Sequence, residues 1–431
     1  MDEFLLIGVF LAVLFFFLGS GIWVGLSLLG VALVGMEMFT SRPAGDAMVT
    51  TIWTASSSWT LTALPMFIWM GEILFRTRLS EDLFRGLSPW LSRLPGGLLH
   101  VNVAGCTLFA AISGSSAATV ATVGKMAIPE LRRRNYPEGL IIGTLAGAGT
   151  LGLLIPPSII LIVYGVTVNQ SIAQLFIAGI LPGIMLASLF MGYILFAALS
   201  RPDRMPSIEH SGSWRQRFRE SVFLLPVVLL IGAVLGSIYT GIATATEAAA
   251  IGVAGALALS AFQGSLTRES FIQSLMGATR TSCMIALILA GSAFLTLAMG
   301  FTGLPRHLAG AIAAMELSPL TLIIALTIFY IVLGCFLDGI SSVVLTMAVV
   351  EPIVRAAGID LIWFGIFVVL VVEMAQITPP VGFNLFVLQG MTGHQITYIA
   401  KVAFPMFLVM CLAVALIIMV PEIATWLPAH M

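Results

Sequence analysis

Long apolar runs separated by short polar segments make up most of the chain. Because a helix needs about 20 apolar residues to cross the hydrocarbon core of a bilayer, each run is a candidate spanning helix. These runs lie near residues 4–18, 21–36, 60–76, 138–166, 172–200, 221–238, 244–263, 281–301, 360–390 and 402–421. The pattern predicts an all-α polytopic membrane protein with about ten spanning helices.

Two further apolar stretches, residues 98–130 and 318–355, are too long for one span and are interrupted near their centres by polar clusters with glycine. Each stretch is either two spans joined by a tight turn or one re-entrant hairpin. A helix from Leu98 to Ile112 rises about 22 Å at 1.5 Å per residue, which is short of the roughly 30 Å core. This length favours hairpins whose tips lie inside the membrane. The tips are Ser113-Gly114-Ser115-Ser116 and Asp338-Gly339-Ile340-Ser341-Ser342.

The distribution of basic residues predicts which segments face the cytoplasm, because Lys and Arg mark that side. With both stretches as hairpins, all Lys and Arg residues fall inside except Arg42, Arg306 and Arg355. Both termini are then expected outside, in the periplasm. The segments 37–59 and 302–317 are also expected outside, and the segments 201–219 and 264–280 inside.

Composition narrows the class of protein. The chain has 431 residues, of which 59% are hydrophobic and only 9% charged, with a mean hydropathy of +1.08. A water-soluble domain could not expose such a surface, so the lipid bilayer is the expected surrounding. A net charge of -1 gives no indication of nucleic-acid binding. The four cysteines stand singly in apolar stretches, which is typical of packing residues.

The two halves of the chain repeat one another in outline. Residues 1–200 form the first predicted repeat and residues 221–431 the second, and the polar segment 201–220 is the linker. Ser115 and Ser341 stand 226 positions apart in the two predicted hairpin tips. In the predicted topology the two repeats have opposite orientation. Inverted repeats are typical of secondary transporters.

Each repeat also carries one proline-broken apolar segment. Pro156-Pro157 interrupts residues 138–166, and Pro379-Pro380 interrupts residues 360–390 at an offset of 223. Proline lacks the N–H donor and so frees carbonyls, which are costly in hydrocarbon unless they line a polar cavity. Freed carbonyls and Ser hydroxyls are oxygen ligands suited to Na⁺, and helix N-termini attract an anionic substrate.

Other chemistry finds little support in the sequence. Lys125 follows Gly124 but lacks the first glycine of a phosphate-binding Walker A loop, and no histidine shares a span centre with Ser or Glu. We therefore expect no enzyme, no cofactor and no metal other than Na⁺.

Four carboxylates lie in or near the predicted membrane segments, where acidic side chains are rare. Glu72 is expected to pair with Arg76 four residues later, and Glu247 to belong to the cap of its helix with Thr244. Asp338 at the second tip and Glu373 before the second break are candidates for tuning cation or substrate binding.

Five segments together resemble the large membrane subunit of tripartite ATP-independent periplasmic (TRAP) transporters, the DctM-like family. They are LFAAISGSSAATVATVGKMAIPELRRRNY, GTLGLLIPPSIILIVYG, YTGIATATEAAAIG, LGCFLDGISSVVLTM and EMAQITPPVGFNLFVLQG. The resemblance implies the elevator-type fold of the ion-transporter superfamily. It also implies symport of Na⁺ with an organic acid, such as a C4-dicarboxylate, a keto acid or a sialic acid, across a bacterial or archaeal inner membrane.

The resemblance further implies two partners, a small four-helix membrane subunit and a periplasmic substrate-binding protein. No segment of this chain corresponds to the small subunit, so we expect it to be a separate protein. Because selectivity in the family is largely set by the binding protein, the sequence leaves the substrate open.

Carried over residue by residue, the resemblance places one Na⁺ in each half. The first site would be formed by Ser113, Ser115, Ser116, Gly152, Ile155 and Pro157. The second would be formed by Gly339, Ser341, Ser342, Ala375, Thr378 and Pro380. Ser158 and Asn384, beside the two breaks, join Asp338 and Glu373 as candidates for substrate binding or tuning. Because the first tip has no acid to match Asp338, the two sites need not have equal affinity.

Two other functions would use similar elements. A standalone divalent-anion symporter or exchanger of a related family would work without a binding protein. A passive channel would also use polar re-entrant tips, but its flux would not saturate.

Overall fold

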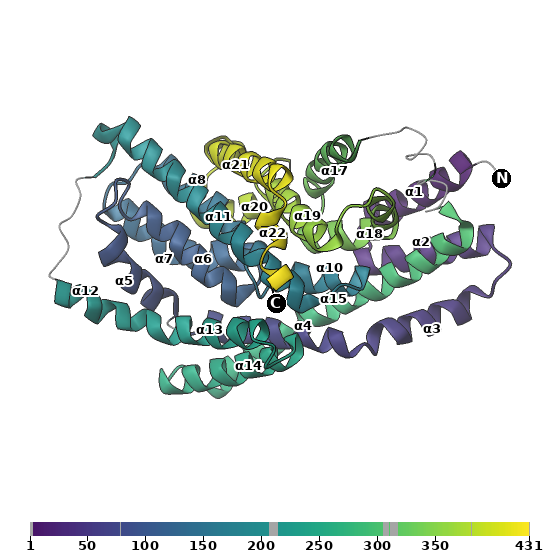
Figure 1. The fold of residues 1–431 in the computed structure, drawn as a ribbon, viewed down its shortest axis with the longest axis horizontal. Coiled ribbons are helices and arrows are strands. Elements are labelled where there is room, and N and C mark those ends of the chain that lie inside the picture. Colours follow the sequence, from purple (N-terminus) through teal and green to yellow (C-terminus); the bar gives the residue numbers. More distant parts are fainter. Residues whose placement is uncertain are drawn as a thin grey trace.

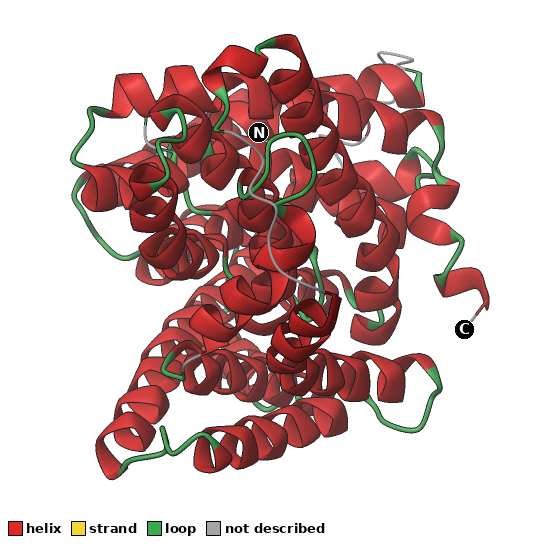
Figure 2. Ribbon diagram, turned by 90° about the vertical axis from the view of Figure 1, so that its left-hand side faces the viewer, coloured by secondary structure: helices red, strands yellow, loops and turns green. Residues whose placement is uncertain are grey.

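The structure is a computed structural model that describes residues 3–77, 79–206, 214–304, 310, 318–380 and 382–430. Within these residues the chain is helical with short connections, and no strand occurs (Figures 1 and 2). The all-α prediction is therefore confirmed. Most of the segment 302–317, which was expected outside, lies beyond the described residues.

The first half contains eleven α-helices in the described residues. They are α1 (Glu3–Gly19), α2 (Val24–Phe39), α3 (Ala44–Ser56), α4 (Ala63–Phe75), α5 (Leu79–Leu91), α6 (Leu99–Ser113), α7 (Ser116–Arg133), α8 (Glu138–Gly149), α9 (Leu151–Leu154), α10 (Ile159–Val168) and α11 (Ile172–Ser200).

The described part of the second half begins in the linker and continues to the C-terminal region. Its helices are α12 (Trp214–Ser221), α13 (Leu225–Tyr239), α14 (Ala245–Phe262), α15 (Arg268–Thr302), α17 (Pro319–Gly334), α18 (Gly339–Ala356), α19 (Leu361–Gln376), α20 (Phe383–Thr392), α21 (Ile396–Met419) and α22 (Glu422–Thr425).

Both predicted hairpins form helix pairs that turn at the expected tips. Helices α6 and α7 are separated only by Gly114 and Ser115, and α17 and α18 are separated by residues 335–338. The first arms contain 15 and 16 residues, respectively. At 1.5 Å per residue these arms are about 22 to 24 Å long, too short for the roughly 30 Å core.

Both predicted broken helices are interrupted at their proline pairs. Helices α8 and α9 (Glu138–Leu154) meet the following helix at an angle of 42°, and residues 377–382 separate α19 from α20. The peptide bonds Pro156-Pro157 and Pro379-Pro380 are both cis.

Three segments predicted as loops contain helix. Residues 37–59 contain α3, which forms a bent pair with the following segment at 55°. The segment 264–280 lies largely in α15, a helix of 35 residues that begins at a capping box of Thr267 and Ser270, and the linker contains α12. The hydropathy pattern does not predict these helices, because it detects apolar runs and does not detect helix caps or helix periodicity.

The number of spans stays a prediction. Among the described residues, six helices are long and apolar enough to cross a membrane, or up to eight if each bent pair is one span.

The expected cap of α14 is confirmed, because Thr244 and Glu247 each accept a hydrogen bond from the other's backbone N–H.

Apart from α5 and α12, the described α-helices pack in two groups, which we call the scaffold group and the central group. The scaffold group contains α1 to α4 and α13 to α15, in which α15 packs against α2, α3 and α4. The central group contains the hairpins, the broken helices, α11, α21 and α22. Figure 1 shows α3, α13 and α14 along one edge of the molecule, while α8, α17 and α21 lie toward the opposite edge.

Helix α19 lies at the centre of the central group. Every residue of α19 except Ile362 is buried, as expected for a helix that is apolar on all sides. The two halves also interlock around it, because α7 of the first hairpin packs on α20, and α18 of the second hairpin packs on α10. Each hairpin therefore contacts the broken helix of the other half.

Glycine allows two helices of the central group to approach closely. A Cβ atom added at Gly143 of α8 would lie 2.4 Å from the carbonyl oxygen of Val402 in α21. Small residues at such crossings let helix backbones pack against one another in membranes.

We predict that Gly143→Ala forces α8 and α21 apart and lowers the free energy of unfolding by about 1–3 kcal/mol. Gly192→Ala in α11 is the matched control, because a Cβ there meets nothing within 4 Å. Thermal unfolding of the purified variants in detergent measures the effect. Equal melting temperatures for the two variants would contradict this packing.

Candidate functional site

The tip of the first hairpin lies against the first proline break. Gly114 ends α6 with a positive φ of 57°, and a Cβ added there would lie 3.0 Å from the carbonyl oxygen of Pro157. A Cβ added at Gly152 would lie 2.6 Å from the carbonyl oxygen of Ser115. Both positions need glycine because backbone meets backbone there. The structure brings this tip and this break into contact.

The hydroxyl groups of the first tip are connected to one another and to the second half. Ser113 Oγ lies 2.8 Å from Thr119 Oγ1, and Thr119 Oγ1 donates to the carbonyl oxygen of Ser115 at 2.8 Å. Ser115 Oγ caps α7 by accepting from the N–H of Ala118. Ser116 Oγ donates to Glu373 Oε1 at 2.5 Å. Each hydroxyl oxygen retains lone pairs that can face a cation.

The tip of the second hairpin is capped by a carboxylate. Asp338 caps α18 and accepts from the backbone N–H groups of Ile340 and Ser341, both at 3.2 Å. Ser341 and Ser342 are buried, and Ser342 Oγ is a buried polar atom without a hydrogen-bond partner. The oxygen of such an unpaired hydroxyl is suited to coordinate a cation such as Na⁺.

The second break is more open than the first. Pro379 and Pro380 are exposed, whereas Pro156 and Pro157 are buried. The carbonyl oxygen of Ala375 already accepts from the N–H of Thr378 at 3.0 Å. The atoms nearest to a Cβ added at Gly339 of the second tip belong to Val372, Leu153 and Ile160, and none of these is a predicted ligand at the second break. The predicted ligands of the second site are thus less closely assembled than those of the first.

A cavity of about 460 Å³ lies between the two tips and the scaffold group. The central group contributes both tips, residues that flank the first break, and Gln376, Phe383 and Asn384 from the second broken helix. The opposite wall comes from α4 and α15. The residues of this wall are Ile68, Gly71, Glu72, Phe75, Thr281 and Met284.

Two buried amides in the cavity wall lack partners. Asn384 is fully buried and neither its Nδ2 nor its Oδ1 atom has a hydrogen-bond partner, and the Nε2 atom of buried Gln376 also has none. Buried polar atoms are almost always satisfied in proteins, so unpaired amides in a cavity wall indicate a position for a polar ligand.

Four helices begin at the cavity. Its wall contains the first residues of α7, α10, α18 and α20, among them Ser116, Ile159, Gly339 and Phe383. The N-terminus of a helix carries unpaired N–H groups and a partial positive charge. Among the described residues the wall contains no Lys or Arg, although Glu72 and Asp338 are part of it.

Ten of the predicted site residues lie outside the cavity wall. They are Ser158, Glu373, Gly152, Ile155, Pro157, Ser341, Ser342, Ala375, Thr378 and Pro380. Ser158 caps α10, because its hydroxyl accepts from the N–H of Leu161 and donates to the carbonyl oxygen of Leu153. Glu373 is fully buried behind the wall, where it contacts Ser116. Ser158 thus satisfies backbone groups at the break instead of facing the cavity.

Sequence reasoning missed several residues of the wall, and two of them, Gln376 and Glu72, carry polar groups beside predicted residues. Gln376 follows Glu373 by three positions and so lies on a neighbouring face of α19, which is the signal that could have identified it. Glu72 pairs with Arg76 at 3.0 Å as predicted, but it also belongs to the cavity wall. The exposure of Glu72 to the cavity depends on how α4 packs against α15, and no local sequence pattern indicates that packing.

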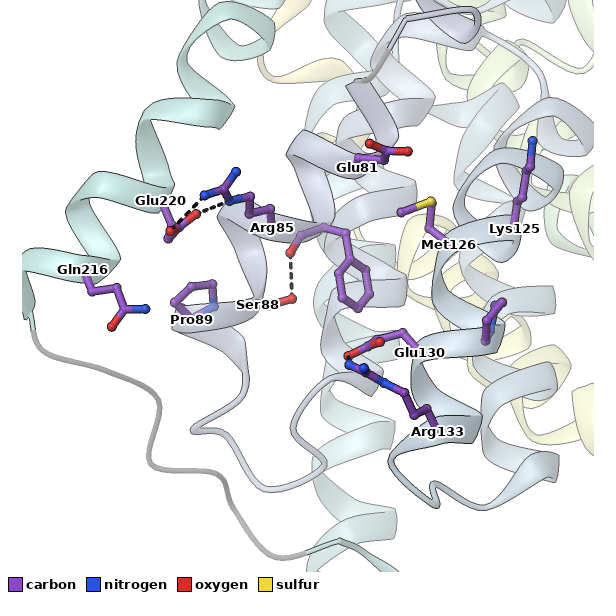
Figure 3. A pocket seen from close by; sticks show the side chains of 12 residues that line it. Glu81, Arg85, Ser88, Pro89, Lys125, Met126, Glu130, Arg133, Gln216 and Glu220 are labelled. Carbon is purple, nitrogen blue, oxygen red and sulfur yellow. Dashed lines mark hydrogen bonds and ion pairs between the residues drawn. The ribbon is translucent and has the colours of Figure 1, made fainter.

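A second cleft, of about 680 Å³, lies between α5, α7 and α12. Figure 3 shows Arg85 of α5 reaching Glu220 of α12, and Glu130 beside Arg133 on α7. The hydrogen bond to Glu220 raises the pKa of Arg85, which stays positively charged. Charges of both signs line this cleft and none of the predicted site residues does, so we place the candidate site at the hairpin tips.

The structure is similar to a known transporter. It matches the YdaH transporter of Alcanivorax borkumensis with a TM-score of 0.64 over 94% of this chain and 97% of that one. The two sequences are 13% identical, so the match concerns the fold alone.

Sequence relatives cover nearly the whole chain. The C4-dicarboxylate TRAP transporter large permease protein DctM of Rhodobacter capsulatus is 32% identical over 430 residues, which are 95% of this chain and 96% of that protein. The isethionate TRAP transporter permease protein DctMQ of Oleidesulfovibrio alaskensis is 31% identical over 96% of this chain. The chain spans 64% of the length of that relative.

The sequence profile of the family described as "Tripartite ATP-independent periplasmic transporter, DctM component" matches residues 11–423. Members of this family are permease subunits of transporters and not enzymes. The predicted resemblance is therefore confirmed, and the chain belongs to the DctM family of TRAP transporter membrane components.

Proposed function

We propose that this chain is the large permease subunit of a TRAP system that imports a small organic anion together with Na⁺ by an elevator movement. The observation that carries the proposal is the cavity at which the N-termini of α7, α10, α18 and α20 converge. The partial positive charge of these helix N-termini favours carboxylate or sulfonate ligands. Anions of both kinds appear in the names of the relatives, as dicarboxylate and isethionate.

Na⁺ coupling follows from the charge balance of the cavity. Its described wall contains Glu72 and Asp338 but no Lys or Arg. Because Glu72 pairs with Arg76, helix N-termini alone would have to hold an anion beside the carboxylate of Asp338. Bound cations near the tips would offset this repulsion. The hydroxyl oxygens of Ser113, Ser116 and Ser342 supply ligands of the right type.

The elevator movement is supported by the position of the cavity between the two groups of helices. The tips and breaks belong to the central group, whereas α4 and α15 belong to the scaffold group. A body that carries both tips and both breaks can move past α4 and α15 without taking the cation ligands apart. We propose that the central group is this moving body.

The membrane, the orientation and the partners that we propose for this chain are those expected for the DctM family. We propose a multi-pass protein of the bacterial or archaeal inner membrane with both termini in the periplasm, since that orientation keeps most basic residues inside. A small four-helix membrane subunit and a periplasmic binding protein that delivers the substrate would be its partners.

We predict that proteoliposomes with this chain, the small subunit and the loaded binding protein accumulate substrate only when Na⁺ is higher outside. Radiolabelled uptake is measured with an inward gradient of NaCl or of KCl, because the two gradients differ only in the cation. Equal uptake with K⁺ would contradict Na⁺ coupling. Unchanged uptake without the binding protein would favour the standalone transporter instead.

We predict that Asn384→Asp raises the KM for uptake at least about tenfold, because a like charge beside a bound anion costs several kcal/mol. Gln389→Glu is the matched control, since it adds the same charge to α20 outside the cavity wall. Uptake kinetics at saturating Na⁺ measure both variants. A KM for Asn384→Asp no higher than that of the control would remove Asn384 from the substrate site.

We predict that a cross-link between the two helix groups stops transport. Ser292 of α15 donates to the carbonyl oxygen of Val344 in α18 at 2.8 Å, so Ser292→Cys with Val344→Cys can be joined by Hg²⁺ in a chain whose own cysteines are replaced. Uptake should be lost on cross-linking and return with a reducing thiol.

The control for this experiment joins two helices of the central group. Asn102 of α6 donates to Thr144 of α8 at 3.1 Å, so Asn102→Cys with Thr144→Cys cross-links the moving body to itself and should leave uptake intact. Full uptake by the cross-linked α15–α18 pair would contradict an elevator movement.

A further inference from the structure

A single buried hydrogen bond connects the tip of the first hairpin to the central helix of the second half. Ser116 Oγ, in the first turn of α7, donates to Glu373 Oε1 of α19 at 2.5 Å. Both side chains are buried, with exposed fractions of 5% and 0%. The two residues are 257 positions apart, so only the tertiary fold brings them together.

The surroundings of Glu373 set it apart from an ordinary buried carboxylate. Its second oxygen, Oε2, has no hydrogen-bond partner, and among the described residues no basic side chain forms an ion pair with it. A carboxylate left without a basic partner costs stability. Glu373 is thus not explained by a structural ion pair.

The bond fixes the orientation of a proposed cation ligand. Ser116 has one hydrogen to donate and two lone pairs, and donation to Glu373 directs the lone pairs away from α19. Partners that hold a ligand in this way orient it and tune the site. Glu373 also lies two positions before Ala375 and five before Thr378, which are the proposed ligands in the second half. Glu373 therefore contacts Ser116, a proposed ligand of the first site, and stands on α19, the helix that contains Ala375 of the second site.

The inverted repeat supplies a natural comparison, because the matching positions lack this bond. Ser342 matches Ser116 at the offset of 226, and its hydroxyl has no partner. Thr150 matches Glu373 at the offset of 223, and its hydroxyl donates to Gly147 within its own helix turn at 2.6 Å. Ser116 and Glu373 are thus joined by a hydrogen bond, whereas the matching residues Ser342 and Thr150 are not.

We propose that Glu373 is a positioning residue that couples the two cation sites through its hydrogen bond with Ser116. Binding of Na⁺ at the first tip orders Ser116 and, through the bond, the turn of α19 before the second break. By thermodynamic linkage, binding at the second site favours the first by the same factor. The proposal rests on the proposed Na⁺ coupling and adds that the two ions bind cooperatively.

The test measures equilibrium binding of radioactive Na⁺ to the purified chain in detergent, which does not depend on uptake. For the wild type we expect a Hill coefficient near two, the limit for two sites. Glu373→Met keeps the length of the side chain and removes both acceptor oxygens. It should lower the Hill coefficient toward one and raise the half-saturating Na⁺ concentration about fivefold or more.

Three further variants separate the hydrogen bond from charge and from general damage. Glu373→Gln keeps an acceptor for Ser116 and should retain a Hill coefficient near two. Thr150→Val, at the matching position of the first half, should also retain it. Ser116→Ala removes the bond together with a proposed cation ligand, so it should lower the Hill coefficient toward one as Glu373→Met does and raise the half-saturating Na⁺ concentration further. In the double variant the Hill coefficient should fall no further than in Ser116→Ala, because the bond is already broken.

Each result bears on the proposal. A Hill coefficient near two in Glu373→Met or Ser116→Ala overturns it, and so does a loss in Glu373→Gln as large as in Glu373→Met, which would assign the effect to charge. A loss in Thr150→Val equal to that in Glu373→Met would also overturn it. If the wild type binds no Na⁺, the proposed function fails first. Cooperative wild-type binding that Glu373→Met leaves unchanged overturns the positioning role alone.

Discussion

The structure depends on one constraint, which is that backbone carbonyls freed inside a membrane must find partners. Each proline pair frees carbonyls in the middle of an apolar helix. The first break is covered by a hairpin tip at backbone contact, which Gly114 and Gly152 make possible. Ser158 satisfies the carbonyl of Leu153 on the other side of the same break. At the first break, the freed carbonyls therefore meet protein instead of lipid.

The two halves interlock through helix packing, whereas the cover of the first break comes from its own half. Helix α7 packs on α20 and α18 packs on α10, so neither half completes its own environment. Four helix N-termini meet at one cavity as a consequence. The hydrogen bond between Ser116 and Glu373 also joins the first half to the second. The interlocking therefore brings the two hairpin tips and the cavity together within the central group.

Local chemistry explains which elements the sequence predicted well. The hairpin tips, both proline breaks, the Thr244–Glu247 cap and the Glu72–Arg76 pair all depend on residues within a few positions of one another. Helices α3 and α12 and the start of α15 were missed because they are more polar than spanning runs. The number of spans and the orientation of the chain stay predictions, since they concern the bilayer and not the contacts of the chain.

By itself, the sequence determined the class of protein, the repeated motifs and the residues around the first break, because apolar length, proline and glycine act locally. Only the tertiary structure decided which residues share a wall. Gln376 and Glu72 face the cavity, Ser158 faces away from it, and Glu373 contacts the opposite half. The physical reason is that these positions depend on helix rotation and on packing between segments far apart in the chain. The matched serines look alike in sequence, yet only Ser116 finds a carboxylate partner.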